Sequence, residues 1–347
     1  MKINLTHIIA AGVLMLAWLA GCDVHEFPDA PAPPQPDNRG EITLHLDFST
    51  EMPPFKEIIY EPSAPDGRHE DGRGTTGYDI RHIVRFFTAN SDSRVPLFEY
   101  IFTSDNDNLD YTAKINVAPG NYRIMVWSDY VTPGSKADRH YSTSDFASIA
   151  LQGSTHSGND DSRDAFRGFA DASVAPQGQH YIDVTMVRPM AKFKFIATDF
   201  DIFLSRAESR NQPKGTPPSS APAFRADDYT LRFRYTGFMP SRFNMFTDRP
   251  GDASTGVHFF SELRPLSSSE AEMGFDYVMV NGKESTVSVA VDVFDRYGQL
   301  IASTDPVDVP LKRSMLTTVR GRFLTSSASP GVGVDPGFTD DFNIFIP

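Results

Sequence analysis

Cysteine, tryptophan and long apolar runs are all scarce in this chain of 347 residues. The single cysteine, Cys22, cannot form an intramolecular disulfide, so the core must be stable without one. Beyond residue 21 no segment approaches the ~18 consecutive apolar residues that indicate a membrane-spanning helix. Acidic residues outnumber basic residues by 45 to 32, which gives a formal net charge of −13. Such a charge opposes the binding of nucleic acid phosphates, so we expect no nucleic acid partner.

Catalytic and metal-binding motifs are also missing. The nine histidines show neither the His-x-His nor the His-Glu-x-x-His spacing of zinc sites, and no Gly-x-Ser-x-Gly nucleophile elbow occurs. We therefore expect no enzyme activity, no metal and no cofactor. A lipid-anchored hydrolase stays a distant alternative, because paired carboxylates from separate strands leave no local motif.

Three stretches match known motifs only in part. Residues 72–77 have the letters of the Gly-x-Gly-x-x-Gly fingerprint, but a charged loop precedes them and a strand-like run follows, whereas dinucleotide binding needs a strand before and a helix after. Residues 104–110 resemble a calcium loop without its glycine, and residues 159–164 form a second acidic cluster. Loops and turns are the better interpretation of all three, with a surface cation site at 159–164 as the minor alternative.

The N-terminus has the features of a bacterial lipoprotein signal. Residues 8–20 form an uncharged apolar run after Lys2, which is too short to span a membrane and typical of a signal peptide. The following Leu19-Ala20-Gly21-Cys22 has the form of a lipobox. We expect cleavage between Gly21 and Cys22, with acyl chains such as palmitate anchoring the Cys22 thiol in a membrane. Residues 1–21 are then the signal peptide.

Residues 22–39 are rich in proline and show no hydrophobic periodicity, which predicts a semi-rigid tether between the lipid and the folded body. Asp23, Glu26 and Asp29 resemble the acidic signals that send such lipoproteins to the cell surface. We expect an outer-membrane location with the body exposed on the surface. The alternative, a body that faces the periplasm, stays open.

Most of the remaining sequence alternates apolar and polar residues with a period of two, which predicts an all-β fold. Clear examples are residues 42–48, 111–117, 229–235 and 287–293, and turn residues at 118–121, 281–282 and 295–298 predict hairpins. On the strand 287–293 we expect Val289 to face the core, and we expect Asn in place of Asp292 on the opposite face to be nearly silent. A short helix is predicted after Asp199, and residues 144–151 fit either a helix or a strand. The break at Arg188-Pro189 divides the body into β-sandwiches over residues 40–188 and 189–347.

Several motifs together resemble the fimbrillin superfamily. They are the lipobox, the strand–turn–strand of residues 115–129, the element at 164–169, the run at 188–195 and the late stretch at 309–324. More narrowly, they resemble the lipoprotein members that assemble or anchor type V pili. The resemblance implies two tandem transthyretin-like antiparallel β-sandwiches, no catalytic site, and partners among other pilus subunits. It also implies assembly by strand exchange, in which a protease removes the first strand of one subunit and a neighbour donates a replacement.

The sequence contains parts that fit such an exchange. Residues 42–48 would be the first strand, and the loop at 51–77 carries Arg68 and Arg73 as processing sites for a trypsin-like protease. At the other end Phe342, Ile344 and Ile346 alternate in a terminal strand that could be donated. The alternative for residues 51–77 is an ordinary loop that is not cut, and the alternative for the terminal strand is that it pairs within the protein's own sheet. An anchor subunit would keep its first strand, whereas a stalk or tip subunit would lose it, and the sequence leaves this choice open.

A surface glycan-binding lipoprotein is the main alternative function. Glycan-binding modules display tryptophans as stacking platforms, and after residue 21 this chain has only Trp127, which lies in a strand pattern and is expected in the core. The host or glycan ligand of an adhesive surface protein is not specified by the sequence.

Overall fold

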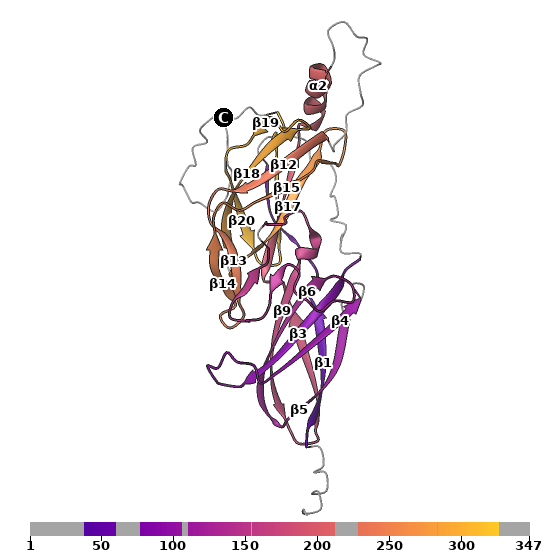
Figure 1. The fold of residues 1–347 in the computed structure, drawn as a ribbon, viewed down its shortest axis with the longest axis vertical. Helices are drawn as coiled ribbons and strands as arrows, with labels where there is room; N and C mark the ends of the chain where they lie inside the picture. The colour runs from indigo at the N-terminus through magenta and orange to yellow at the C-terminus, as the bar shows by residue number, and fades with distance from the viewer. Residues whose placement is uncertain are drawn as a thin grey trace, which may run out of the picture.

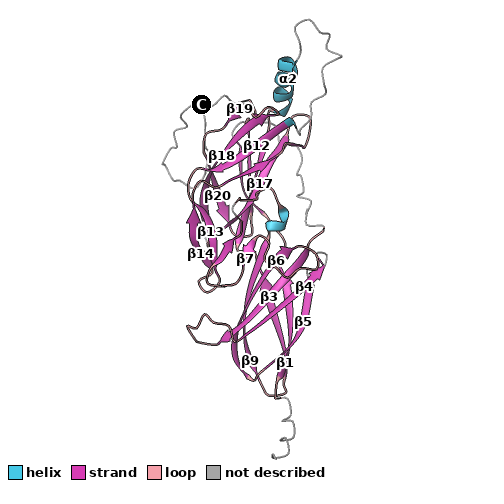
Figure 2. Cartoon of the chain, viewed as in Figure 1, coloured by secondary structure: helices cyan, strands magenta, loops and turns pink. Residues whose placement is uncertain are grey.

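The computed structural model describes residues 38–59, 77–105, 110–153, 155–211, 228–282 and 284–325. These residues form an elongated body of β-strands, with one α-helix, α2 (Phe200–Asn211), at the end opposite β1 (Figures 1 and 2). The all-β prediction is confirmed, and so is the short helix after Asp199. The residues predicted for lipidation, processing and donation lie outside the described ranges: Gly21, Cys22, Arg68, Arg73, Phe342, Ile344 and Ile346.

The N-terminal half is a sandwich of two sheets. A three-stranded sheet has the order β10 (Gln179–Met186), β1 (Gly40–Phe48), β5 (Asp110–Val117). A four-stranded sheet has the order β4 (Phe98–Asp105), β3 (Asp79–Thr88), β6 (Gly120–Val131), β9 (Ala165–Val174). Alternate residues of each strand point into the core between them, as the period of two predicts. The most deeply buried include Ile42, Leu44, Val84, Phe86, Ile124 and Val126.

The C-terminal half is a second sandwich. Its first sheet has the order β16 (Arg264–Pro265), β17 (Ala271–Met279), β11 (Met190–Ala197), β21 (Leu316–Gly321), β2 (Pro54–Ile59). Its second sheet has the order β15 (His258–Ser261), β12 (Tyr229–Tyr235), β18 (Glu284–Asp295), β19 (Leu300–Ser303), and β20 (Val307–Lys312) also pairs with β18. The core between these sheets is rich in aromatic residues. It includes Phe193, Phe195, Phe233 and Phe259, and Phe200 and Phe203 of α2 cover one end.

A smaller sheet joins the two halves. Its order is β14 (Arg249–Ser254), β13 (Met239–Asn244), β8 (Ile149–Leu151), β7 (Tyr141–Ser142), so it pairs strands from both halves of the sequence. A third apolar cluster lies beneath it, where Trp127 of β6 contacts the rings of Tyr141 and Phe243. Trp127 is fully buried, as the sequence predicts, and it therefore offers no platform for a sugar.

The strand pairing does not follow the expected division at residues 188 and 189. β2 and β8 precede that point in the sequence but pair with β21 and β13 of the C-terminal half. Three pairings are parallel, β1 with β10, β11 with β21 and β2 with β21, within sheets that are otherwise antiparallel. Turn residues reveal only neighbours in sequence, so these long-range pairings left no signal. The domain limits 40–188 and 189–347 stay a prediction.

Two of the three predicted hairpins are wrong. The turns at 118–121 and 281–282 connect strands of different sheets, β5 to β6 and β17 to β18. Only the turn at 295–298 joins paired strands, β18 and β19, with Gly298 at a φ of +75°. Turn residues indicate that the chain reverses. They do not indicate whether it returns beside the first strand or across the sandwich.

Asp292 also differs from its expected role. It is buried on the outer side of β18, where its Oδ2 atom lies 2.7 Å from Arg232 Nη2 and 2.7 Å from Arg234 Nε, and Ser303 donates to Oδ1 at 2.7 Å. Burial raises the pKa of Asp292, but these hydrogen bonds outweigh it and lower the pKa to about 2. We therefore expect substitution by Asn to destabilise the protein, because it removes the charge that balances Arg232 and Arg234.

Val289 tests the orientation of β18. Its side chain is fully buried in the C-terminal core, so Val289→Asp places a carboxylate in apolar surroundings and should lower the free energy of unfolding by several kcal/mol. Thr286→Asp adds the same charge to an exposed position of the same strand and serves as the control. Thermal melting followed by circular dichroism compares the two. Equal effects would contradict the assignment of the two faces.

Candidate functional site

The described part of the chain begins with a segment, residues 40–59, that belongs to both halves of the body. β1 is the central strand of the three-stranded sheet, paired along its length with β10 on one side and β5 on the other. β2 then forms the edge of the first sheet of the C-terminal half, beside β21. One short stretch of sequence therefore completes a sheet in each sandwich.

β1 is deeply embedded. Ile42, Leu44 and Leu46 are each at most 1% exposed. At the start of the strand, a Cβ on Gly40 would lie 2.5 Å from Val174 Cγ1 and 2.7 Å from the Ala175 carbonyl oxygen, so only glycine fits against the β9–β10 connection. Removal of β1 would expose this apolar row and separate β5 from β10.

The assignment of residues 51–77 to a loop is wrong in part, because β2 occupies residues 54–59. Its residues are exposed or half-buried, so no alternation of apolar and polar residues marked it as a strand. It depends instead on backbone pairing with β21. Pro54 at its first position is compatible with an edge strand, since proline cannot donate a ladder hydrogen bond.

A buried arginine fixes the connection between β1 and β2. Arg188 Nη1 donates to the carbonyl oxygens of Thr50 and Glu51 at 2.9 and 3.2 Å. Arg188 Nη2 also lies 2.7 Å from Asp164 Oδ2, and both side chains are buried. Burial lowers the pKa of Arg188, but the Asp164 carboxylate raises it by more, so the arginine stays charged. The sequence showed Arg188 only as a strand boundary.

Further ion pairs join the two halves. Asp276 of β17 lies 2.5 Å from Arg163 Nη1 and 2.6 Å from His156 Nε2, and it accepts a hydrogen bond from the Tyr235 hydroxyl at 2.6 Å. Burial raises the pKa of Asp276, but Arg163 and His156 oppose this and leave the pKa below its usual range. Separately, the Asp248 carboxylate forms ion pairs with two arginines: its Oδ1 lies 2.7 Å from Arg167 Nε and its Oδ2 lies 2.7 Å from Arg313 Nη1. The two sandwiches are thus held by buried charge as well as by apolar packing.

The acidic cluster at 159–164 takes part in this joint. Asp160 accepts from the backbone and hydroxyl of Ser162, and Asp161 lies 3.0 Å from Lys192 Nζ. Asp164 in turn pairs with Arg188, so each of these three carboxylates binds a partner within the chain. Within the described ranges no cluster of three or more His, Cys, Asp or Glu side chains could hold a metal ion.

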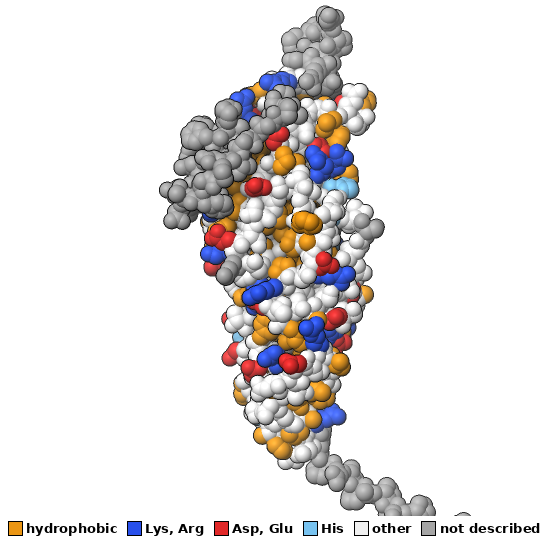
Figure 3. Space-filling model, turned by 90° about the vertical axis from the view of Figure 1, so that its left-hand side faces the viewer, with side chains coloured by type: hydrophobic (Ala, Val, Ile, Leu, Met, Phe, Trp, Pro, Cys, Tyr) orange, Lys and Arg blue, Asp and Glu red, His pale blue; other side chains and the backbone are white. Residues whose placement is uncertain are grey.

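The partial motifs at 72–77 and 104–110 lie mostly outside the described residues. Where the described residues resume at Gly77, the next element is the strand β3. Dinucleotide binding requires a helix at this position, with its N-terminus directed at the pyrophosphate. Among the helices in the described ranges, none is long and apolar enough to cross a membrane. Acidic and basic side chains are interspersed on the face shown in Figure 3.

His45 crosses the outer face of the three-stranded sheet. Its Nδ1 lies 2.9 Å from Asp183 of β10 and its Nε2 lies 2.7 Å from Asp110 of β5. Hydrogen bonds to Asp183 and then Asp110 raise the pKa of His45. The imidazole therefore bridges the two strands that flank β1.

The bridge predicts a pH-dependent stability. The pKa of His45 is higher in the folded state than in the unfolded state. Protonated His45 therefore contributes its full stabilisation of the fold below the unfolded-state pKa of about 6.5, and this stabilisation is lost as the pH rises through the folded-state pKa. Both aspartates are well exposed, so screening limits the effect to less than about 1 kcal/mol. Denaturant unfolding of the wild type and His45→Gln should differ at pH 5.5 and converge at pH 8.5. A constant difference across this range would contradict the bridge.

A family profile matches residues 36–347, and its description is a family of unknown function (DUF6562). The chain belongs to this family. No curated protein matches the chain at a significant level.

Among solved structures, the chain is similar to the fimbrial anchor protein Mfa2 from Porphyromonas gingivalis, with a TM-score of 0.37 and 11% identity over 76% of this chain and 82% of that one. It is also similar to a fimbrial assembly protein from Parabacteroides distasonis, with a TM-score of 0.35 and 9% identity over 81% of this chain and 90% of that one. Both neighbours are described as fimbrial proteins. At these identities and TM-scores the likeness does not say what this chain does.

Proposed function

We propose that this protein is a non-enzymatic, lipid-anchored subunit or anchor of a surface fimbrium that assembles by β-strand complementation. The observation that carries the proposal is the position of residues 40–59, which supply the central strand of one sheet and the edge strand of another. A segment that completes both sandwiches is suited to replacement by the strand of a neighbouring subunit, because its loss leaves open edges on β5 and β10 in one half and on β21 in the other.

The predicted processing sites suit such a replacement. Arg68 and Arg73 follow β2 in the sequence, so a cut at either one would separate both β1 and β2 from the rest of the body. Removal of β1 would leave empty the apolar positions that Ile42, Leu44 and Leu46 fill, and removal of β2 would leave β21 with an unpaired edge. The incoming strand would gain backbone hydrogen bonds at both places and side-chain register from the pockets of β1. The terminal alternation of Phe342, Ile344 and Ile346 is the candidate donor.

The lipid anchor is tested by Cys22→Ser. Serine lacks the thiol that forms the thioether, so the variant should keep its signal peptide or be released without lipid. Metabolic labelling with palmitate measures this directly. Equal labelling of the variant and the wild type would contradict the anchor, and protease treatment of intact cells reports whether the body is on the outer surface.

Processing is tested by the double substitution Arg68→Ala and Arg73→Ala. If the protein is a stalk or tip subunit, the variant should fold as a monomer with an unchanged melting temperature but form no polymer, since β1 and β2 stay in place. The control is Arg94→Ala, at an exposed arginine in the turn between β3 and β4. N-terminal sequencing of the surface protein and a polymer ladder on gels are the measurements.

The same sequencing separates the two roles. A surface chain that begins after Arg68 or Arg73 identifies a polymerising subunit. A chain that begins at acylated Cys22 identifies an anchor, in which β1 and β2 are retained and the double substitution has no effect on the polymer. Absence of any polymer in cells that express the wild type would contradict the fimbrial proposal as a whole.

A further inference from the structure

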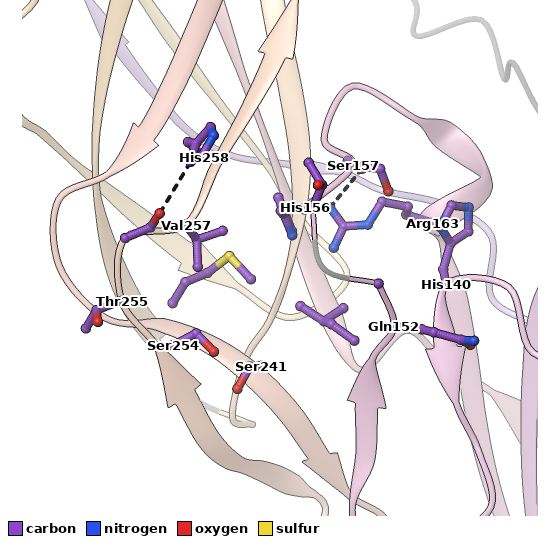
Figure 4. Close-up of a pocket in the computed structure, with 15 residues that line it drawn as sticks. His140, Gln152, His156, Ser157, Arg163, Ser241, Ser254, Thr255, Val257 and His258 are labelled. Atoms are coloured by element: carbon purple, nitrogen blue, oxygen red, sulfur yellow. Dashed lines mark hydrogen bonds between the residues drawn. The ribbon is translucent and has the colours of Figure 1, made fainter.

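A pocket of about 350 Å³ opens where the two halves meet. One wall comes from β13 and the turn between β14 and β15, and the other from the residues that follow β8 and from Arg163 (Figure 4). Among the described residues that line it, none is a phenylalanine, tyrosine or tryptophan, and Arg163 and His156 are already paired with Asp276. This pocket therefore offers a ligand neither an aromatic face nor an unpaired charge from those two side chains.

A hollow of about 550 Å³ lies on the outer face of the sheet that contains β15, β12 and β18. We call it the outer hollow. Its floor is formed by Thr230, Arg232, Phe260 and Phe294 of these three strands, and one end is formed by Asp228 and Arg296. The three strands belong to the half of the elongated body that contains α2, away from β1 (Figure 1). The volume lies within the range of small-molecule sites.

Two phenylalanine rings face the outer hollow from different strands. On β15, Phe259 is buried in the core and the next residue, Phe260, is 53% exposed on the outer face. On β18, Val293 is buried in the core and Phe294 follows it on the outer face, half-buried. Neither Phe260 nor Phe294 belongs to the three apolar clusters of the described residues, so core packing does not account for these two rings.

Arg232 holds a position between the two rings, because β12 lies between β15 and β18. It is the register partner of Phe260, and its guanidinium carbon is 5.1 Å from the centre of the Phe294 ring. Its Nε and Nη2 donate to Asp292 at 3.1 and 2.7 Å, which fixes the plane of the guanidinium without using Nη1. The floor is thus a rigid arrangement of two aromatic faces and one planar donor group.

The charges around the outer hollow cancel. Its two arginines, Arg232 and Arg296, are matched in number by two carboxylates, Asp228 and Asp295. Arg296 Nη2 lies 2.5 Å from Asp228 Oδ2, Arg232 is paired with Asp292, and Asp295 accepts two backbone N–H groups. A charged ligand therefore finds no excess of the opposite charge here. A neutral ligand can still bond to the N–H groups and carboxylate oxygens that these pairs leave over.

The floor of the outer hollow does not suit an extended peptide. β12 is paired with β15 and β18, and β18 is paired with β12, β19 and β20, so neither strand offers an unpaired edge to another backbone. A neutral sugar fits both kinds of group in the lining. The faces of a pyranose ring present C–H groups to aromatic rings, and its hydroxyl groups both donate and accept hydrogen bonds.

We propose that the outer hollow binds a neutral saccharide, with one sugar ring stacked on Phe260 and its hydroxyl groups bonded to the polar side chains around it. Trp127 is buried and cannot serve as a stacking surface, and the exposed phenylalanine takes that role. None of the residues that line the outer hollow belongs to β1 or β2. Saccharide binding is therefore additional to strand complementation and does not depend on it.

Neutral oligosaccharides test the proposal. The full lipidated chain is held in micelles of a polyoxyethylene detergent, which has no sugar headgroup, and is titrated with tetrasaccharides of glucose, mannose, galactose and N-acetylglucosamine by saturation-transfer NMR. At least one of the four should bind saturably with a Kd below about 1 mM, and saturation should be greatest at the C–H protons of the stacked ring. Binding of none of the four would overturn the proposal. A peptide of residues 337–347 is titrated in parallel, and binding of this peptide without any saccharide would assign the outer hollow to a protein segment instead.

Variants locate the site. Phe260→Ala should weaken binding of that saccharide about tenfold, because it removes the stacking ring, whereas Phe260→Trp should bind at least as tightly as the wild type. Phe238→Ala is the matched control, since Phe238 is an exposed phenylalanine in the turn between β12 and β13 that does not line the outer hollow. Equal affinity of Phe260→Ala and Phe238→Ala would overturn the assignment. Melting temperature and polymer formation in these variants should equal those of the wild type, which separates this proposal from strand complementation.

Discussion

The structure depends on the buried charge at the joint between the two sandwiches. Asp276 is removed from water and stays ionised because Arg163, His156 and Tyr235 surround it. A buried ion pair stabilises little relative to apolar packing, but the loss of one partner leaves an isolated charge that costs several kcal/mol. These pairs therefore permit few relative positions of the two halves. A fixed joint is what allows one segment, residues 40–59, to pair in both sandwiches, and it also gives the pocket its two walls.

Pairing across the joint has a consequence for folding. β1 meets β10 from about 140 residues later in the chain, and β2 meets β21 from about 260 residues later. Such long-range contacts are costly to close in loop entropy, so we expect them to form after the contacts between strands that are near in sequence.

The sequence predicted what local pattern can encode. Alternation identified the buried faces of β1, β12 and β18, and Trp127 was correctly expected in the core. The sequence pattern could not identify β2, whose stability comes from backbone hydrogen bonds to β21, and it could not show that two of the turns cross between sheets. Asp292 was expected to be dispensable because its strand face carried polar residues, yet Arg232 and Arg234 converge on it. The pocket was equally hidden, because its two walls come from segments that lie about 90 residues apart in the sequence.

The position of β1 also determines how the body would respond to a pulling force. β1, which begins at Gly40, lies in the half of the elongated body farther from α2, and the strand runs along the long axis of the body (Figure 1). A force applied at Gly40 acts along the strand, so the ladder bonds to β5 and β10 share the load and must yield together. The same bonds would open one after another if the strand were peeled from its side. A tether attached at Gly40 therefore loads the sheet in its mechanically strongest direction.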